Sequence, residues 1–344
     1  MDKFASKKCF IVAEIGINHN GKFDTAIKMI GAAKECGADA VKLQTFTGDD
    51  FYWKDKEFIF GKSGQWKEQI RHLFDSRKLT RDEIRRLYEY SNEIGILCFS
   101  TPLSFEWLDF LEGVGNPIYK ISSGDVTCLP LIEEIAKIGK PIILSTGKSK
   151  LSDVDAAAQT IQQYNSRKLG ILHCVAAYPA PLDQANLKMI QSYAALYDCV
   201  PGFSDHTEGI LAASVSVAFG AKIIEKHFTL DKNDYGPDHW FSMDQAELRH
   251  LVSSIREVER MVGHGHKQLL KIEEDSYIWG SRCIVLNKNK KKGETIKNMD
   301  LDYKRPCLGL RSDSSEILVG GTLVRDMQKD MPVALSDLEL SRIQ

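Results

Sequence analysis

The sequence lacks the features of a membrane-spanning, secreted or nucleic-acid-binding protein. No apolar stretch reaches the ~18 residues that a transmembrane helix needs, and the apolar run near the N-terminus is too short for a signal peptide. The formal net charge of the 344 residues is only −2. Neither nucleic acid nor an anionic membrane surface is therefore an expected partner, and we expect a cytoplasmic location.

Metal-binding and redox spacings of cysteine are also missing. None of the eight cysteines forms a CxxC pair, and most lie in apolar stretches such as ILCFS and ILHCV, which is typical of buried free thiols. The one basic run, NKNKKKGE at 287–294, is short and ends in an acid. We interpret it as a solvated loop. The length and the 43% apolar content predict one large globular domain and one small one.

One pattern is present eight times, a short apolar segment followed by an amphipathic one. The helix-like segments are 24–36, 80–94, 104–112, 129–138, 151–164, 186–197, 210–219 and 244–262, and a TRDE capping box begins the second. The strand candidates are 9–16, 40–46, 96–102, 117–124, 141–147, 169–175, 200–207 and 222–229. Eight such units in about 265 residues predict an α/β fold, a (β/α)8 TIM barrel, rather than an open doubly wound sheet.

Nearly every predicted strand ends in polar or charged residues. One such residue alone would more often be a surface group. A ring of them at one end of a barrel indicates a shared site, because barrel enzymes carry their active sites at the C-terminal ends of the strands and buried charges need a partner or a ligand. The ring comprises Glu14, Lys42, Gln44, Ser100, Thr101, Lys120, Ser122, Ser123, Asp125, Ser145, Thr146, His173, Ser204, Asp205, His206, Glu225, Lys226 and His227.

The residue types in this ring suit an anion, a metal and acid–base chemistry. His206 and His227 end neighbouring strands and could meet at one divalent metal; no cysteine or third histidine completes a zinc site, so we expect an open, partly hydrated one. Glu14, Asp125 and Asp238 are acid–base candidates. Lysines and hydroxyls suited to a phosphate or carboxylate are Lys42, Lys120, Thr101, Ser123, Ser145 and Ser204.

Two other classes of protein stay open on these residues. Lys42, Lys120 and Lys226 could each form the Schiff base of an aldolase, which borohydride trapping with a keto substrate would reveal. A barrel without catalysis, used as a scaffold, is the second alternative. Against it, a purely structural barrel has no reason to retain so costly a ring of charges.

Nine motifs occur along the chain in a fixed order: AEIGINHNG, GADAVKLQTF, FSTP, KISSGD, ILSTG, HCVAAYPAP, FSDHTEG, IIEKHFTLDK and GPDH. Together they resemble the sialic acid (N-acetylneuraminate) synthase family. The later segment GSRCIVLNKNKKKGETIKNMDLDYKRPCLG resembles that family's C-terminal antifreeze-like (SAF) domain. The resemblance implies a barrel at 1–265, a linker at 266–281 and an antifreeze-like domain at 282–344.

This resemblance implies a synthase that condenses phosphoenolpyruvate with an open-chain N-acyl mannosamine-type sugar, giving a sialic-acid-like nonulosonate and phosphate by C–O cleavage. It implies Mn²⁺ or Mg²⁺ on His206 and His227. Glu14 and Asp125 would be catalytic, Asp125 standing where bacterial members often have Glu in a KxxSGE motif. The implied sugar-binding residues are Gln44, Tyr178, Asp238 and Arg305, and the implied phosphoenolpyruvate-binding residues are Lys42, Thr101, Lys120, Ser123, Ser145 and Ser204.

Arg305 carries a further implication. It matches an arginine that the family's antifreeze-like domain inserts into the active site of the partner subunit, so the resemblance implies a domain-swapped homodimer. From the sequence alone, a surface ion pair is the alternative.

Two loops depart from the commonest form of the family. HCVAAYPAP carries Ala176 and Ala177 where many members have polar or acidic residues, and GPDHWFSMD carries Trp240 and Phe241. Less polar walls would suit a 6-deoxy or diacetamido sugar, as in legionaminate- and pseudaminate-type synthases. A synthase for a phosphorylated sugar is a further alternative, but no second basic cluster is visible. Residues 51–53, FYW, could cover the site as a lid or pack as a local cluster.

Overall fold

The computed structural model describes residues 8–339. The chain divides into two compact units between Gly263 and His264, and each is described by itself. None of the helices within residues 8–339 is long and apolar enough to cross a membrane. All eight cysteines are free thiols; Cys128 is exposed and Cys307 half-buried, against our expectation, and the others are buried.

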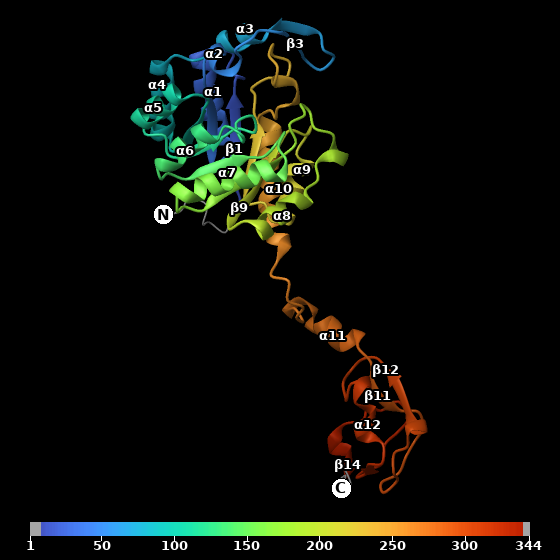
Figure 1. The fold of residues 1–344 in the computed structure, drawn as a ribbon. Helices are drawn as coiled ribbons and strands as arrows, with labels where there is room; N and C mark the ends of the chain where they lie inside the picture. The colour runs from blue at the N-terminus through green and yellow to red at the C-terminus, as the bar shows by residue number, and fades with distance from the viewer. Residues whose placement is uncertain (1–7, 340–344) are drawn as a thin grey trace. The chain divides into compact units, whose positions relative to one another are not determined.

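The first unit is a closed barrel of parallel strands, as predicted (Figure 1). Around the ring the order is β1-β10-β9-β8-β7-β6-β5-β2. Each observed strand overlaps its predicted segment, and its ends differ from the predicted ones by at most three residues. The bounds are β1 Phe10–Gly16, β2 Ala40–Thr45, β5 Leu97–Pro102, β6 Tyr119–Ile121, β7 Ile142–Ser145, β8 Leu169–Cys174, β9 Cys199–Asp205 and β10 Ile223–His227.

Helices follow the barrel strands in the predicted segments. In α4 the capping box forms: Thr80 Oγ1 accepts a hydrogen bond from Glu83 N, Glu83 accepts one from Thr80 N, and the helix ends at Gly95 with φ 71°, a left-handed conformation that glycine adopts without strain. The bounds are α1 Phe23–Glu35, α4 Arg81–Ile94, α5 Phe105–Val114, α6 Leu129–Lys137, α7 Leu151–Tyr164, α8 Lys188–Leu196, α9 Leu211–Ala218 and α10 Gln245–Val262.

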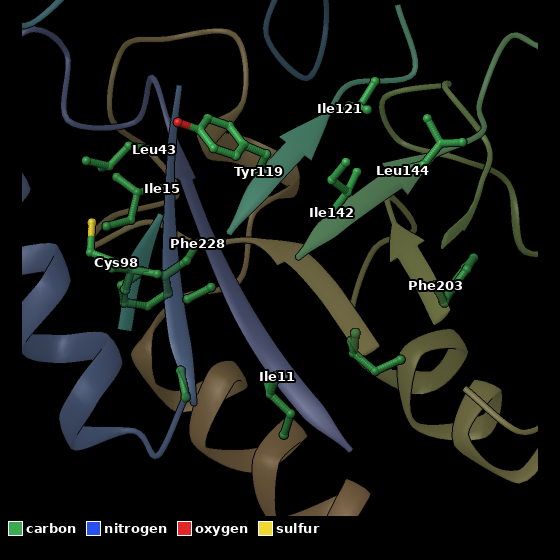
Figure 2. Packing of buried hydrophobic residues seen from close by; sticks show 14 of the residues in the cluster. Ile11, Ile15, Leu43, Cys98, Tyr119, Ile121, Ile142, Leu144, Phe203 and Phe228 are labelled. Atoms are coloured by element: carbon green, nitrogen blue, oxygen red, sulfur yellow. The ribbon is translucent and has the colours of Figure 1, made fainter. Parts of the chain in front are cut away.

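The outward faces of the strands pack against these helices and form the main core. Ile11 and Ile15 of β1, Leu43 of β2 and Phe203 of β9 belong to this cluster, and Figure 2 shows their side chains projecting from the strands. Burial of each such apolar side chain stabilises the fold by about 1.5–3 kcal/mol. The outward faces therefore provide most of the apolar core.

Inside the barrel, side chains change from apolar to polar along each strand. Every strand or its approach contributes one buried apolar residue to an inner layer: Val12, Ala40, Phe99, Ile118, Ile143, Leu172, Val200 and Ile223. Gly202 lies in this region because a Cβ there would approach Leu172 Cδ2 to 2.4 Å. Since residues two apart share a face of a strand, the next inward positions toward the C-terminal end are mostly the predicted polar ones.

An insertion between β2 and α4 adds structure that the sequence patterns did not predict. It contains α2 (Gly48–Phe51), an antiparallel hairpin of β3 (Glu57–Phe60) and β4 (Trp66–Gln69), and α3 (Ile70–Asp75). Each strand of the hairpin has four residues, too few for a reliable period-two pattern. The hairpin pairs with no barrel strand, so side-chain contacts must hold it.

The second unit has its own small core. Its first α-helix is α11 (Glu274–Gly280), inside the segment expected to be a linker. The elements that follow are β11 (Cys283–Leu286), β12 (Leu301–Lys304), α12 (Ser315–Leu318), β13 (Thr322–Leu323) and β14 (Leu338–Glu339). Ile284 and Leu318 are fully buried in the core. Lys290, expected in a solvated loop, is also buried, and its Nζ lies 2.6 Å from Asp300 Oδ2.

Candidate active site

A cavity of about 600 Å³ lies at the C-terminal ends of the barrel strands. It is lined by all the first-unit residues that the family resemblance places in the site: Glu14, Lys42, Gln44, Thr101, Lys120, Ser123, Asp125, Ser145, Tyr178, Ser204, His206, His227 and Asp238. Five members of the predicted ring do not line it: Ser100, Thr146, His173, Asp205 and Lys226. Arg305 belongs to the second unit, where it is exposed after β12. Within residues 8–339 it makes no ion pair, so the surface-pair alternative finds no support, and its role at a site stays a prediction.

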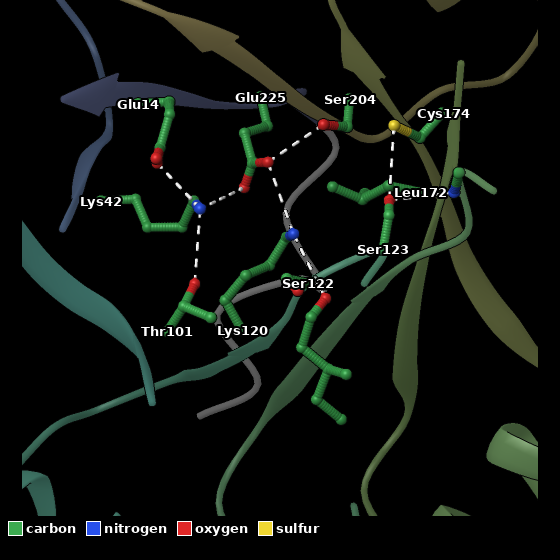
Figure 3. A network of polar contacts seen from close by, with 12 residues as sticks. Glu14, Lys42, Thr101, Lys120, Ser122, Ser123, Leu172, Cys174, Ser204 and Glu225 are labelled. Carbon is green, nitrogen blue, oxygen red and sulfur yellow. Dashed lines mark hydrogen bonds and ion pairs between the residues drawn. The ribbon is translucent and has the colours of Figure 1, made fainter. Parts of the chain in front are cut away.

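The inner end of the cavity is a charged floor made by Glu14, Lys42, Lys120 and Glu225. Lys42 Nζ lies 2.9 Å from Glu14 Oε2 and 3.7 Å from Glu225 Oε2, and Lys120 Nζ lies 3.5 Å from Glu225 Oε1. Figure 3 shows both ammonium groups turned toward Glu225. All four side chains are buried, so these two lysines and two carboxylates balance one another's charge.

Hydroxyl groups surround the charged floor. Lys42 Nζ donates to Thr101 Oγ1 at 3.4 Å, and Ser204 Oγ donates to Glu225 Oε1 at 3.0 Å. Ser145 Oγ is buried and has no hydrogen-bond partner within residues 8–339. A buried hydroxyl without a partner is unfavourable, so Ser145 is available to a ligand. This combination of ammonium and hydroxyl donors is suited to a phosphate or a carboxylate.

The charged floor shifts the protonation of its members in different directions. Burial raises the pKa of Glu14, although Lys42 opposes the shift. Burial would also raise the pKa of Glu225, but Lys120 and Lys42 bring it below its usual range. Burial lowers the pKa of Lys120, against the attraction of Glu225. Glu14 is therefore the floor carboxyl that accepts a proton more readily, and Glu225 stays ionised.

Glu225 ends its predicted strand, but the sequence patterns assign it no role in the site. The available signal was its spacing: it lies two residues before His227, so the two side chains share the inward face of β10. The same rule removes Lys226 from the Schiff-base candidates. Lys226 points out of the barrel, where its Nζ lies 2.8 Å from Asp205 Oδ2, and it does not line the cavity.

His206 and His227 both line the cavity, and the centroids of their rings lie 5.4 Å apart. His206 Nδ1 lies 2.9 Å from the Val175 carbonyl oxygen, which places its proton on Nδ1 and leaves the Nε2 lone pair free. His227 Nδ1 lies 3.7 Å from Asp238 Oδ2 and has no hydrogen-bond partner within the described chain. Burial holds the pKa of His227 well below its usual range, and a proton on both ring nitrogens of His206 would lower it further.

These two imidazoles fit a divalent metal. Ring nitrogens with free lone pairs are good ligands, and an outer hydrogen bond such as that of His206 to a carbonyl is the usual arrangement around a metal-binding histidine. Residues 8–339 contain no group of three or more His, Cys, Asp or Glu placed to hold a metal ion. A metal here would therefore keep open positions for water or substrate.

Asp125 lies at the side of the cavity with a hydrogen bond that the sequence did not predict. Ser122 Oγ donates to Asp125 Oδ2 at 2.5 Å. Burial raises the pKa of Asp125, with Ser122 and Lys120 opposing. The neighbouring Ser123 accepts a hydrogen bond from Gly147 N at 2.9 Å. Ser122 thus fixes the orientation of the shorter carboxylate.

The outer part of the cavity is an apolar wall. It comprises Tyr52, Phe58, Phe60, Leu73, Phe74, Leu103, Pro237 and Trp240. Tyr52 both lines the cavity and stacks on Phe74, with centroids 6.1 Å apart, whereas Trp53 is 91% exposed and the side chain of Phe51 lies outside what the structure describes. Of the residues that depart from the common family form, Trp240 lines the cavity; Ala176, Ala177 and Phe241 do not.

Tyr235 joins the two segments that build the apolar wall. It belongs to the loop after β10, and its hydroxyl donates to Glu68 Oε1 of β4 at 2.5 Å. Its ring lies 5.1 Å from that of Trp66, and the guanidinium of Arg77 stands 5.4 Å over its face. Arg77 is buried and paired with Glu68 at 3.0 Å. These contacts hold the β3–β4 hairpin against the loop that carries Trp240.

The closed barrel, with a cavity at its strand ends that holds a charged floor and two histidines, has the arrangement of a barrel enzyme. The NeuB family model matches residues 29–267, and the chain belongs to the NeuB family. It is therefore an enzyme of the synthase type, which confirms the resemblance seen in the motifs. The antifreeze-like assignment of the second unit stays a prediction.

Individual relatives agree with this assignment. The N,N'-diacetyllegionaminic acid synthase of Campylobacter jejuni is 36% identical over 335 residues, 94% of this chain and 98% of that one. The N-acetylneuraminate-9-phosphate synthase of Mus musculus is 38% identical over 271 residues, 77% and 74% of the two chains. A crystal structure of an N-acetylneuraminic acid synthetase from Leptospira borgpetersenii superposes with a TM-score of 0.71 at 32% identity, covering 78% of this chain and 90% of that one.

Proposed function

We propose that this enzyme condenses phosphoenolpyruvate with the open-chain aldehyde of an N-acyl amino sugar, forming a nine-carbon 2-keto acid (a nonulosonate) and phosphate. The observation that carries the proposal is the charged floor with its unpartnered Ser145, set in the same cavity as His206 and His227. The first suits the anionic substrate, and the second suits a metal that binds a carbonyl oxygen.

Phosphoenolpyruvate would bind at the charged floor. Its phosphate and carboxylate would take the donors of Lys42 and Lys120 and the hydroxyls of Thr101, Ser123, Ser145 and Ser204. The ammonium groups already lie against Glu225 and Glu14, so the anion would be received by lysines whose positions are fixed before it arrives. Such preorganised charge is the largest contribution to many enzymatic rate enhancements.

The residues would then move protons around the reacting carbons. C3 of phosphoenolpyruvate attacks the aldehyde carbon, the aldehyde oxygen takes up a proton, water adds at C2, and the C2–O bond to phosphate breaks. Glu14 and Asp125 are the groups assigned to these transfers, because burial raises the pKa of both toward the range that suits general acid–base catalysis. When bound on His206 and His227, Mn²⁺ or Mg²⁺ would supply Lewis-acid polarisation of the aldehyde.

The sugar would lie between the histidines and the apolar wall. Gln44, Tyr178 and Asp238 line this part of the cavity, and Arg305 of a partner subunit in a domain-swapped homodimer would complete it. An N-acyl mannosamine-type sugar is one acceptor. The apolar wall favours a second, a 2,4-diacetamido-2,4,6-trideoxy hexose, because a methyl group in place of a hydroxymethyl loses no hydrogen bond against Trp240 and Phe60.

One experiment tests the reaction and the acceptor together. Phosphate release from phosphoenolpyruvate would be followed with Mn²⁺ across N-acetylmannosamine, its 6-phosphate and 2,4-diacetamido-2,4,6-trideoxy hexoses, with mass analysis of the products. We expect release with an N-acyl sugar and its absence without sugar. With ¹⁸O in the bridging position of phosphoenolpyruvate, the label should leave with phosphate. Label retained in the keto acid would contradict C–O cleavage.

The shared site has a separate test. Arg305→Ala and His206→Ala, each inactive alone, should recover activity when mixed as heterodimers, because one of the two sites would then be intact. No recovery in a mixture shown to exchange subunits would contradict sharing across subunits.

A further inference from the structure

A buried ion pair lies on the outward side of the barrel where β9 and β10 end. Lys226 Nζ lies 2.8 Å from Asp205 Oδ2 and 2.6 Å from the Thr207 carbonyl oxygen. The side chains of Lys226 and Asp205 are only 2% and 0% exposed. Asp205 Oδ1 accepts a further hydrogen bond from Thr207 N at 2.8 Å. The pair does not line the cavity, so it contacts no substrate there.

Its position along the chain connects it to the two histidines. Lys226 and Asp205 are direct partners in the register of β10 and β9. His227 follows Lys226, and His206 follows Asp205. The pair and the Thr207 carbonyl therefore fix the backbone immediately beside both imidazoles, from the face opposite to the cavity.

Stability alone is a weak explanation for this pair. Removing two charges from water costs several kcal/mol for each ion, and apolar residues of similar volume are often equally or more stable. What a hydrogen-bonded buried pair does provide is one defined arrangement of the segments that it joins.

We propose that Lys226 is a positioning residue: with Asp205 it holds the ends of β9 and β10 so that the rings of His206 and His227 are preorganised, 5.4 Å apart, to bind one divalent cation. This inference rests on the metal site of the proposed function. Groups that orient ligands from outside the site typically change metal affinity or activity by about 10- to 100-fold when removed.

The second unit supplies a matched control. Lys290 Nζ lies 2.6 Å from Asp300 Oδ2 and 2.8 Å from the Thr295 carbonyl oxygen, and the two side chains are 5% and 1% exposed. It is the same arrangement of lysine, aspartate and threonine carbonyl, with one addition, Lys288 at 2.7 Å from Asp300 Oδ1. Its residues are not adjacent in sequence to either histidine.

The test measures Mn²⁺ alone binding to the full-length, metal-stripped protein by calorimetry and by electron paramagnetic resonance, without substrates. Lys226→Met should weaken Mn²⁺ binding about 10- to 100-fold, and Lys290→Met should leave it within about twofold while also lowering the unfolding temperature. Lys226→Arg, which retains charge and donors, should recover part of the affinity.

A folded Lys226→Met protein that binds Mn²⁺ as tightly as the unaltered chain would overturn the inference. If that variant does not fold, Asp205→Asn and the double variant Lys226→Met/Asp205→Leu serve instead, the latter because apolar residues can replace a buried pair without loss of stability. Both should bind Mn²⁺ more weakly, and undiminished binding by either folded variant would overturn the inference. Failure of the unaltered protein to bind Mn²⁺ would overturn the metal assignment itself, and this inference with it.

Discussion

The charged floor and the apolar wall of the cavity are built in different ways. The charged floor comes from strand ends of the barrel, so the hydrogen-bonded register between β1, β2 and β10 fixes where Glu14, Lys42 and Glu225 stand. The apolar wall comes from the insertion after β2 and the loop after β10, which are held by their own side chains. The comparison indicates that, in the proposed function, the scaffold would fix the chemistry and the loops would select the acceptor sugar.

The largest expected effect is at the charged floor. Lys42→Met should reduce turnover roughly 100- to 1,000-fold or more, because removing one preorganised donor from a catalytic site costs about that much. The measurement is steady-state phosphate release at saturating sugar. Lys148→Met is the control, since Lys148 also lines the cavity but is exposed. Equal losses in both variants would contradict the special role of the charged floor.

The next prediction distinguishes the role of the Asp125 carboxylate from that of Ser122, whose hydroxyl donates a hydrogen bond to it. Asp125→Asn should lower turnover by about 10²-fold, the lower end of what loss of a general acid or base costs. Ser122→Ala removes only the hydrogen bond that orients Asp125, a net interaction of about 1.5–3 kcal/mol with a charged group, and should lower turnover less. If both variants turn over normally, the catalytic assignment of Asp125 is wrong.

Metal removal should abolish most activity without affecting the fold. Chelation of the unaltered enzyme should stop phosphate release, and added Mn²⁺ should restore it. His206→Ala should lose at least about 10-fold in both turnover and Mn²⁺ affinity. Unchanged turnover in chelated buffer would contradict a metal role for the histidines. The residues of the charged floor would then have to account for the whole catalytic effect.

A smaller effect is expected at the apolar wall. Trp240→Ala should raise the KM for a deoxy sugar about fourfold for each methyl group that loses its contact, at about 0.8 kcal/mol per group, and should leave the KM for phosphoenolpyruvate unchanged. Trp53→Ala is the matched control, because Trp53 is 91% exposed. A rise in the KM for phosphoenolpyruvate instead would remove the distinction between floor and wall.

The smallest effect concerns the contact that joins the two wall segments. Tyr235→Phe keeps the ring but loses the hydrogen bond to Glu68, and an exposed polar contact with a charged group is worth about 0.5 kcal/mol. We expect the sugar KM to rise about twofold. Tyr197→Phe removes a comparable hydrogen bond to Asp155 at 3.0 Å outside the cavity-lining residues and should change neither KM.

Much of the barrel and its site could be predicted because both depend on short-range patterns. The strands were found from apolar runs bounded by helical segments, and the floor residues from their place at strand ends. Position at a strand end alone does not distinguish Lys226 from Glu225 and His227, whereas strict alternation of side chains along the strand does. The hairpin and the Tyr235 contact could not be predicted, because four-residue strands carry too little periodicity and Glu68 and Tyr235 are far apart in sequence.

The inner apolar layer beneath the charged floor has a kinetic consequence. The eight residues of this layer are at most 8% exposed, so no molecule can pass through the lower end of the barrel. A molecule bound at the floor must enter and leave past the position of the one bound at the wall. If phosphoenolpyruvate binds at the floor and the sugar at the wall, as proposed, binding should be sequential, with the anion first and the sugar second, and excess sugar should slow turnover by occupying enzyme that has not yet received its anion.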